Sequence, residues 1–489
     1  MSISGSMANA ISGLTAASRS AGVISSNIAN ALTDGYGRRE LQVSANQIGN
    51  SGQGVTVTGV SRDVDQMLIA ERRTAEASSA DLDARASFLS RLESALGTPE
   101  AGSSLSGRVA ALDAAFIAAA SQPSSEVRQQ EVVTAANALA NTFQSISSEI
   151  QTSRLNADSQ IAADVETVNS ALATIAELNR SITSLSSSGR DSSALLDQRQ
   201  QLIDQVSTII PVRELPRDNG QVALMTSGGA FLLDGKAATL EFSSVGTITP
   251  DMTQAAGGLS GLTINGRSVD TGSNGPLSGG SMAAEFAIRD ELATSAQSEL
   301  DAMARDLISR FQEPSADPLV APDPGLFTDR GSAFTNDAAL LEAQEIGISS
   351  RISLNAAVDP AEGGELWRLR DGLDAVTPGP VGESALFTSM QTALNETREI
   401  ESGQFAGSSR SLSGFSGQLL SAVATERLSV ELEAGFAAAR TNTLKGLELE
   451  GGVDTDSELQ DLLLVEQAYA ANAKVIQTAD EMIQILLGM

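Results

Sequence analysis

The chain of 489 residues contains no cysteine and no histidine. Without cysteine there can be no disulfide, no thiol nucleophile and no thiolate-bound zinc or iron–sulfur cluster. Without histidine there can be no Ser-His-Asp triad, no HExxH zinc site and no imidazole proton shuttle. Carboxylate, Ser/Lys or magnesium chemistry would survive both absences. We therefore expect a protein that is not an enzyme, with no catalytic residue, no cofactor and no metal site.

Basic residues are also scarce. The chain has 31 Lys and Arg against 61 Asp and Glu, a formal net charge of −30, and it contains no basic run. Nucleic-acid binding depends on Lys and Arg that neutralise phosphates. The charge therefore argues against a DNA or RNA partner.

Long hydrophobic runs are missing as well. The longest, such as residues 114–120, fall far short of the roughly 20 apolar residues that a spanning helix needs. The first 13 residues have neither a basic region nor a continuous apolar region, as a cleavable secretory signal would. We expect no membrane insertion and no cleaved signal peptide.

The motifs of common binding sites are absent or incomplete. Asp454, Asp456 and Glu458 resemble the start of a calcium loop, but Leu459 and Val465 stand where that loop requires Gly and Glu. These acids fit better in the first turn of a helix, where they favour its dipole, with Asp454 or Thr455 as the N-cap. There is no Walker A motif, GxGxxG or SxxK pattern.

Both ends of the chain have helical periodicity. The N-terminal stretch carries mostly small apolar residues at alternating spacings of three and four, which predicts one long helix with a heptad stripe; its members are Met7, Ala10, Leu14, Ala17, Ala21, Ile24, Ile28 and Ala31. The C-terminal stretch carries a similar stripe beside a second apolar one; the first contains Leu459, Leu462, Tyr469, Ala473, Ile476, Ile483 and Leu487. Because this apolar arc is wider than one partner helix would cover, we expect it to dock on the other terminus or on another subunit.

The middle of the chain predicts a rod of bundled helices interrupted by a β region. Helical stripes run through residues 82–96, 139–209 and 293–311. Between residues 211 and 280, short apolar runs alternate with turn signals, and Asn265-Gly266 is the strongest hairpin signal among them. From Glu313 to about Pro380 we expect short strands and loops.

These patterns predict a mainly α fold with an inserted β domain. The molecule would be an elongated multi-domain rod, with a coiled coil of the terminal helices, a long helical bundle and a small β domain. We assign residues 1–33 and 455–489 to the terminal coiled coil, 34–210 and 281–454 to the helical rod, and 211–280 to the β insertion.

The segment SSNIANALTDGYGRRE, residues 25–40, resembles the N-terminal signature ANNIANxxTxGY of flagellar axial proteins. The matching residues are Asn27, Ile28, Ala29, Asn30, Thr33, Gly35 and Tyr36, whereas Ser26 replaces the first Asn of the pattern. The chemistry fits a helix end: Asn30 can stop the helix, Gly35 permits a positive φ, and Tyr36 can seat its ring with the hydroxyl hydrated.

Later segments narrow the resemblance to the family of the first hook–filament junction protein. ALLDQRQQLIDQVSTIIPV at residues 194–212 is the most specific of them, and GVSRDVDQMLIAERRTA at residues 59–75, GLFTD at 325–329 and the last helix are also similar. The β insertion is short for this family.

The resemblance implies a structural junction protein outside the cell, exported from the cytoplasm and connecting the hook to the filament by axial packing of its terminal helices. Implied partners are the hook protein, the second junction protein, copies of the chain in a ring layer, and a cytoplasmic export chaperone at the C-terminal helix. Implied packing residues are Leu14, Ile24, Asn27, Ile28, Asn30, Leu462, Tyr469, Ile476 and Ile483, with Thr33, Gly35 and Tyr36 in the signature turn.

Two alternatives stay open at this point. One is another axial protein, namely the second junction protein, flagellin, or a hook or rod subunit. The other is a cell-wall hydrolase that uses two carboxylates.

Overall fold

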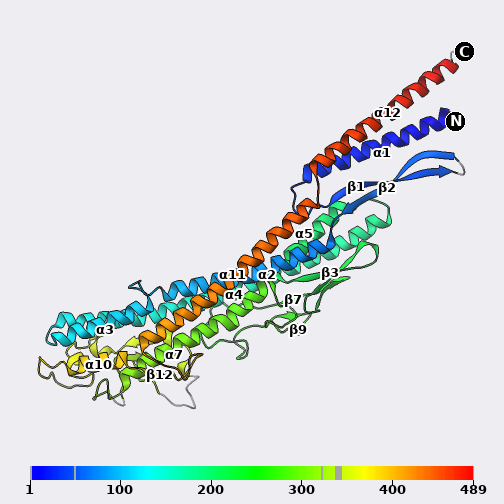
Figure 1. Ribbon diagram of the computed structural model, residues 1–489. Coiled ribbons are helices and arrows are strands. Elements are labelled where there is room, and N and C mark those ends of the chain that lie inside the picture. Colours follow the sequence, from blue (N-terminus) through cyan, green and yellow to red (C-terminus); the bar gives the residue numbers. More distant parts are fainter. Residues whose placement is uncertain (1–2, 49–50, 321–322, 336–343, 488–489) are drawn as a thin grey trace.

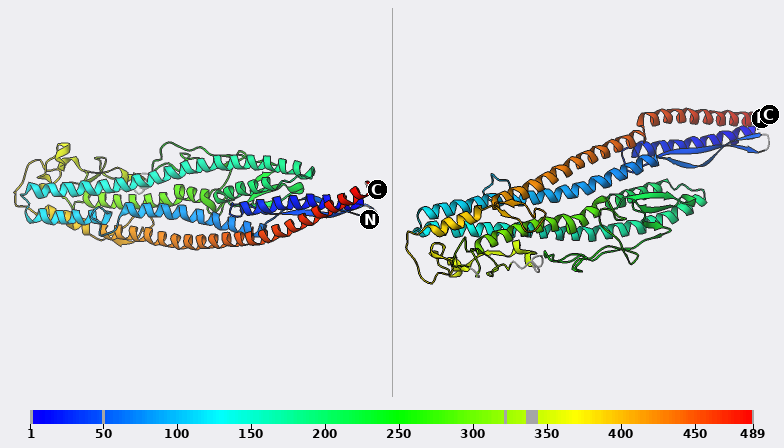
Figure 2. Two further views of the ribbon diagram at one scale, coloured as in Figure 1. Left: turned by 90° about the horizontal axis from the view of Figure 1, so that it is seen from above. Right: turned by 60° about the horizontal axis from the view of Figure 1, so that its bottom comes forward.

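A computed structural model of the chain describes residues 3–48, 51–320, 323–335 and 344–487. The molecule is elongated, and its two termini lie side by side at one end (Figures 1 and 2). The helices are α1 (Ile3–Asn30), α2 (Gln66–Leu96), α3 (Leu105–Ser121), α4 (Glu126–Ser187), α5 (Ser193–Ile209), α6 (Gly280–Ala287), α7 (Ala293–Gln312), α9 (Arg368–Asp371), α10 (Ala385–Asn395), α11 (Leu412–Glu450) and α12 (Thr455–Leu487). The predicted fold class, a mainly α rod with small β elements, is confirmed.

The terminal helices α1 and α12 pack along each other and extend beyond the rod (Figure 1). On α1, Ala10, Ala17 and Ile24 are buried at a spacing of seven residues, the repeat that a two-helix seam requires. The chain enters α12 through Gly451 and Gly452, and the Asp454 carboxylate accepts hydrogen bonds from the Asp456 and Ser457 amides, as an N-cap does.

A long β-hairpin lies where the sequence analysis expected only helical rod. Strands β1 (Arg38–Ile48) and β2 (Ser51–Asp63) pair antiparallel and lie against α1 (Figure 1). Apolar residues alternate with polar ones over Leu41 to Ala45 and again over Val55 to Val57, which is the period of a half-buried strand. The sequence analysis assigned residues 34–210 to the helical rod and did not predict this hairpin.

The rod is built from both halves of the chain around one long helix. Helix α4 runs through most of it and contacts α3, α5, α6 and α7, while α11 packs antiparallel on α2. The two helices of that pair are also joined by ion pairs from Arg72 to Glu448 and from Arg427 to Glu93. A large apolar core fills the half of the rod far from the termini, with Phe116, Phe143 and Phe311 fully buried in it.

The predicted β region is present as two small sheets. The first has the order β3 (Val212–Pro216), β4 (Val222–Thr226), β5 (Phe231–Asp234) and β6 (Lys236–Ala237). The second has β7 (Leu240–Glu241), β8 (Thr263–Ile264) and β9 (Arg267–Ser268). The hairpin at Asn265-Gly266 is confirmed, since both residues have positive φ and connect β8 to β9.

The sheets are not a separate globule. Residues of β3 to β8 share one apolar core with the second half of α4 and with α5. Buried arginines also hold the loop between β7 and β8: Arg154 donates to the carbonyls of Thr249 and Met252, and Arg289 donates to that of Ser260. Asp158 neutralises Arg289 at 2.7 Å, with both side chains fully buried.

Between residues 313 and 380 the expected short strands and loops are present, with β10 (Phe327–Asp329) paired with β11 (Ile352–Leu354), but this stretch also contains the short helix α9. Beyond it, outside the predicted stretch, β12 (Arg398–Glu399) pairs with β13 (Ser409–Arg410). Residues 321–322 and 336–343, within the stretch expected to form strands and loops, lie outside the described residues. The division into three domains stays a prediction.

Candidate functional site at the base of the terminal helices

Asn27 lies where α1, the hairpin and α12 meet, and it is 1% exposed. Its Nδ2 donates to the Arg39 carbonyl at 2.9 Å and to Glu458 Oε2 at 3.0 Å. Its Oδ1 accepts from the Tyr36 hydroxyl at 2.9 Å and from the Arg39 amide at 3.1 Å. The amide thus uses its two donors and both acceptor positions, so only an Asn of this orientation satisfies all four neighbours.

Glu458 brings the C-terminal helix into the same site. Its carboxylate is 1% exposed, accepts from Asn27 and pairs with Arg38 Nε at 2.7 Å. The bond to Glu458 raises the pKa of Arg38, against the lowering effect of burial. Removing one donor from a buried, paired carboxylate leaves a costly unpaired charge. The first turn of α12 is therefore locked to residues 27 and 38 at the other end of the chain.

Asp197 of α5 holds the signature turn against the rod. It accepts from the Gly37 amide at 3.1 Å, from Arg39 Nη2 at 2.7 Å and from Arg62 Nε at 2.6 Å. Gly35 has a φ of +75°, which favours glycine, and a Cβ there would lie 2.9 Å from the Gln201 side chain, which would have to shift. The two segments that carried the family resemblance, residues 25–40 and 194–212, thus bind each other.

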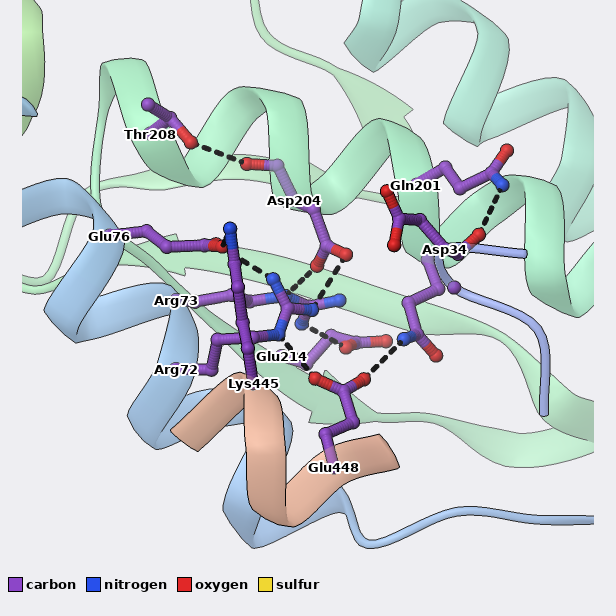
Figure 3. Close-up of polar contacts among 12 residues, drawn as sticks. Asp34, Arg72, Arg73, Glu76, Gln201, Asp204, Thr208, Glu214, Lys445 and Glu448 are labelled. Carbon is purple, nitrogen blue, oxygen red and sulfur yellow. Dashed lines mark hydrogen bonds and ion pairs between the residues drawn. The ribbon is translucent and has the colours of Figure 1, made fainter. Parts of the chain in front are cut away.

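A second ion-pair network, linked to the first through Gln200, is drawn in Figure 3. Arg72 and Arg73 of α2 share Asp204 of α5, at 2.8 and 2.5 Å, and Arg73 also binds Glu214 of β3 at 2.6 Å. Arg72 reaches Glu448 of α11 as well. Burial alone would lower the pKa of Arg72, but Asp204 and the other carboxylates raise it above its ordinary value, which keeps the guanidinium charged.

Together these contacts form what we call the joint: Asn27, Arg38, Arg39, Arg62, Arg72, Arg73, Asp197, Asp204, Glu448 and Glu458. Its members come from both chain ends and from the middle, and Arg and carboxylate groups bind each other in fixed, directional geometry. The joint can therefore set the direction in which the terminal helices leave the rod. Among the described residues no group of acids could hold a metal ion, and no helix there is long and apolar enough to cross a membrane.

Sequence reasoning selected Asn27 and Tyr36 as assembly and signature residues, and the structure brings these two together inside the joint. Thr33 and Asn30 lie at the helix end, where Asn30 Nδ2 donates to the Ser26 carbonyl. The predicted packing residues lie along the α1–α12 pair: Ile24 is buried, Tyr469 is 48% exposed, and Leu14, Ile28, Leu462, Ile476 and Ile483 are partly buried. Their role in packing between subunits stays a prediction.

The charged members of the joint were missed as individual site residues. A signal was present, because the chain has 28 Arg but only three Lys, and Arg suits partly desolvated ion pairs. The doublets Arg38-Arg39 and Arg72-Arg73 also lie inside segments that carry the resemblance. Their acidic partners could not be assigned from sequence, since residues such as Arg38 and Glu458 are 420 positions apart.

Helix α12 exposes apolar side chains over a wide arc. Large apolar side chains on this helix are 42 to 82% exposed, and α1 is its main helical neighbour; they are Leu459, Leu463, Leu464, Tyr469, Val475, Met482, Ile485, Leu486 and Leu487. An apolar surface of this extent on a folded chain is typical of an interaction site.

Comparisons with known proteins match these same elements. Residues 89–317 match the flagellar hook-associated protein FlgK helical domain. Residues 7–36 match the flagella basal body rod protein family, and residues 450–489 match the C-terminal family of flagellar basal body rod FlgEFG proteins. The two rod-protein matches thus cover α1 and α12.

Similar proteins of known identity carry the same family name as the helical-domain match. Flagellar hook-associated protein 1 of Escherichia coli is 28% identical over 279 residues, 55% of this chain and 51% of that protein. The same protein of Salmonella typhimurium is 29% identical, over 47% of this chain and 42% of that protein, and the one of Bacillus subtilis is 26% identical, over 42 and 43%. The chain thus aligns with about half the length of these relatives.

A solved structure of the flagellar hook junction protein FlgK from Burkholderia pseudomallei is 21% identical, with a TM-score of 0.45 over 54% of this chain and 46% of that one. The chain is thus similar to flagellar hook-associated protein 1 over about half its length, and its residues 89–317 match the helical domain of that family.

Proposed function

We propose that this protein is a structural subunit of the bacterial flagellum that connects the hook to the filament. The observation that carries the proposal is the pair of terminal helices, which are held to the rod by the joint and keep a wide apolar surface exposed on α12. That surface would be buried by neighbouring copies in an axial polymer. Burying one large apolar side chain contributes about 1.5–3 kcal/mol, so several of them per copy suffice to drive association.

The proposed partners follow from the place in the polymer. Copies of this chain form one ring layer, the hook protein lies on one side and the second junction protein on the other. A cytoplasmic export chaperone covers the apolar face of α12 before assembly. The protein works outside the cell as part of the flagellum, after export from the cytoplasm, and it catalyses no reaction.

Deletion of the gene in its host, followed by electron microscopy, tests the proposal. We expect cells with hooks but without filaments, and unpolymerised flagellin in the medium. Missing hooks would instead favour a rod or hook subunit, and normal filaments would contradict the proposal. A saturable turnover of peptidoglycan, abolished by an Asp or Glu substitution, would favour the hydrolase alternative.

Complementation with two matched variants tests the role of α12. Leu486→Asp places a charge on its exposed face and should fail to restore filaments. Val376→Asp changes a residue that is 91% exposed on the rod and should restore them. If both variants restore filaments equally, the exposed face of α12 is not an assembly surface.

A further inference from the structure

A cavity of about 730 Å³ opens on the rod beside the joint, between α2, β3 and α11. Its apolar lining includes Met67, Ala70 and Leu215. Five arginines also line it, against only two carboxylates, Glu71 and Glu214; the arginines are Arg73, Arg199, Arg213, Arg217 and Arg440. In a chain with a net charge of −30, this local excess of positive charge is exceptional.

Part of the positive charge of the cavity has no carboxylate partner. Arg73 is paired with Asp204 and Glu214. Arg217 is paired with Asp234, but the remaining arginines of the cavity have no such pair among the described residues. Arg213 and Arg440 are exposed, and no carboxylate of the described residues lies within ion-pair distance of either. Arg73 is 2% exposed and its Nη2 is a buried donor without a hydrogen-bond partner.

Neighbouring arginines make the electrostatic potential around Arg199 more positive. Burial lowers the pKa of Arg199, and the neighbouring Arg62 and Arg73 lower it again, while Glu214 acts in the opposite direction. Arginine stays protonated under all physiological conditions. The arginines of the cavity therefore stay charged, and the cavity attracts an anion.

An exposed apolar row leads along α11 to the mouth of the cavity. Leu428, Leu432 and Phe436 are 52, 65 and 75% exposed and follow each other at intervals of four residues, and Arg440 continues this row into the cavity. Met67, on the rim contributed by α2, is 74% exposed. The surface thus fits a partner that presents leucine-like side chains next to carboxylates.

The first turns of α12 present such a surface. Asp456, Leu459, Leu463 and Glu466 are spaced by three, four and three residues, so they share one helix face, and all four are exposed. The two leucines are 49 and 59% exposed. Residues 455–466 contain four acids and no cation. Because α12 leaves the joint away from the rod (Figure 2), it does not cover the cavity of its own chain.

We propose that this acidic apolar face of α12, the face of Asp456, Leu459, Leu463 and Glu466, docks into the arginine-lined cavity of a second copy of the chain. The proposal rests on the proposed function and names a specific contact within the polymer. The leucines lie against Met67 and the apolar row of α11, while Asp456 and Glu466 face Arg213 and Arg440. The opposite charges select the partner and fix the register of the two surfaces. Electrostatic complementarity gives this specificity more effectively than apolar contact alone.

Disulfide cross-linking between copies tests the contact, and the absence of native cysteine makes the result unambiguous. Two single-cysteine variants, Met67→Cys and Leu463→Cys, are co-expressed in the deletion host so that any disulfide joining the two positions is between copies. Oxidation of isolated flagella should give a species of twice the chain mass that neither variant gives when it is expressed alone. The control pair, Ile117→Cys with Leu463→Cys, uses a residue that is 52% exposed on α3 and should give none.

The outcomes separate this inference from the proposed function. If the variants restore filaments but the Met67–Leu463 pair does not cross-link above the control, the contact is wrong and the proposed function stands. If neither the native chain nor the variants enter the flagellum, the proposed function fails and the contact fails with it. A cross-link only in the first pair supports the contact.

A charge exchange gives an independent measurement. Arg440→Glu places two like charges together and should reduce incorporation into flagella about tenfold. Glu466→Arg should do the same, and the double variant, in which each copy carries both changes, should recover most of the loss. Failure of the double variant to recover would overturn the pairing of these two residues.

Discussion

Asn27 is a signature residue whose two donor and two acceptor positions are all used within the chain. Its four hydrogen bonds join α1, the signature turn and α12. Asn30, three positions later, bonds only within its own helix end. The two asparagines of the signature therefore have different physical roles, although the sequence presents them alike.

Asn27→Ala should loosen the joint. The change leaves the buried Glu458 with fewer donors and the Arg39 amide without its acceptor, which should cost about 2–4 kcal/mol of local stability. Hydrogen exchange of the backbone amides in the first turns of α12 measures this, as faster exchange than in the native chain. Asn30→Ala is the matched control and should change exchange little. Equal effects of the two changes would contradict the assigned role of Asn27.

Glu285 gives the rod a pH-dependent stability. Burial, together with the nearby Asp164, raises the pKa of Glu285 from 4.5 to about 7, while Arg91 lowers it. A carboxyl whose pKa is raised on folding stabilises the fold fully below its unfolded pKa, and this contribution is lost as the pH rises through the folded value. The free energy of unfolding should therefore fall between about pH 4.5 and 7.

Glu285→Gln should remove that part of the pH dependence. At pH 8 the variant should be more stable than the native chain, by at most about 3 kcal/mol, and near pH 4 the two should be similar. Denaturant unfolding across this range measures the difference. Burial also raises the pKa of Asp301 to about 6, but this group is the same in both proteins and cancels in the comparison. Parallel pH curves would contradict the assignment.

At the scale of elements, helices and turns with a local sequence pattern were predicted, whereas contacts between residues distant in the sequence were not. Periodic stripes located the terminal helices, and the Asn265-Gly266 turn located a hairpin, because both depend on residues near in sequence. The hairpin of β1 and β2 was missed although its alternation is present. That the sheets share a core with α4 was missed because contacts such as Asn169 to Leu240 join distant residues.

The terminal pair and the rod should be thermally independent elements. Neither apolar core of the rod contains a residue of α1 or α12. Removing residues 455–489 should therefore shift the melting temperature of the rod by no more than about 2–4 °C. Phe143→Ala, at a fully buried core position, should cost about 3–5 kcal/mol and serves as the contrast. Calorimetry measures both, and a large shift in the truncated chain would mean that the terminal helices support the rod.

At the scale of the whole molecule, assembly has to overcome repulsion between copies that each carry a net charge of −30. Screening shortens the range of this repulsion from about 30 Å at 0.01 M salt to about 8 Å at 0.15 M. The apolar contacts of α12 do not depend on screening in this way. Association between copies should therefore strengthen as salt is raised to physiological strength, although the arginine-lined cavity contributes less.

Neutralising acids far from the terminal helices tests this balance. Glu100, Glu362 and Glu365 are exposed on the rod, and their replacement by Gln reduces the repulsion without touching α12 or the cavity. The triple variant should associate more strongly than the native chain at low salt, and the two should converge as salt increases. Sedimentation at several salt concentrations measures both trends. Association that weakened steadily with salt would mean instead that attraction between charges, as between the cavity and Glu466, outweighs the repulsion of whole chains.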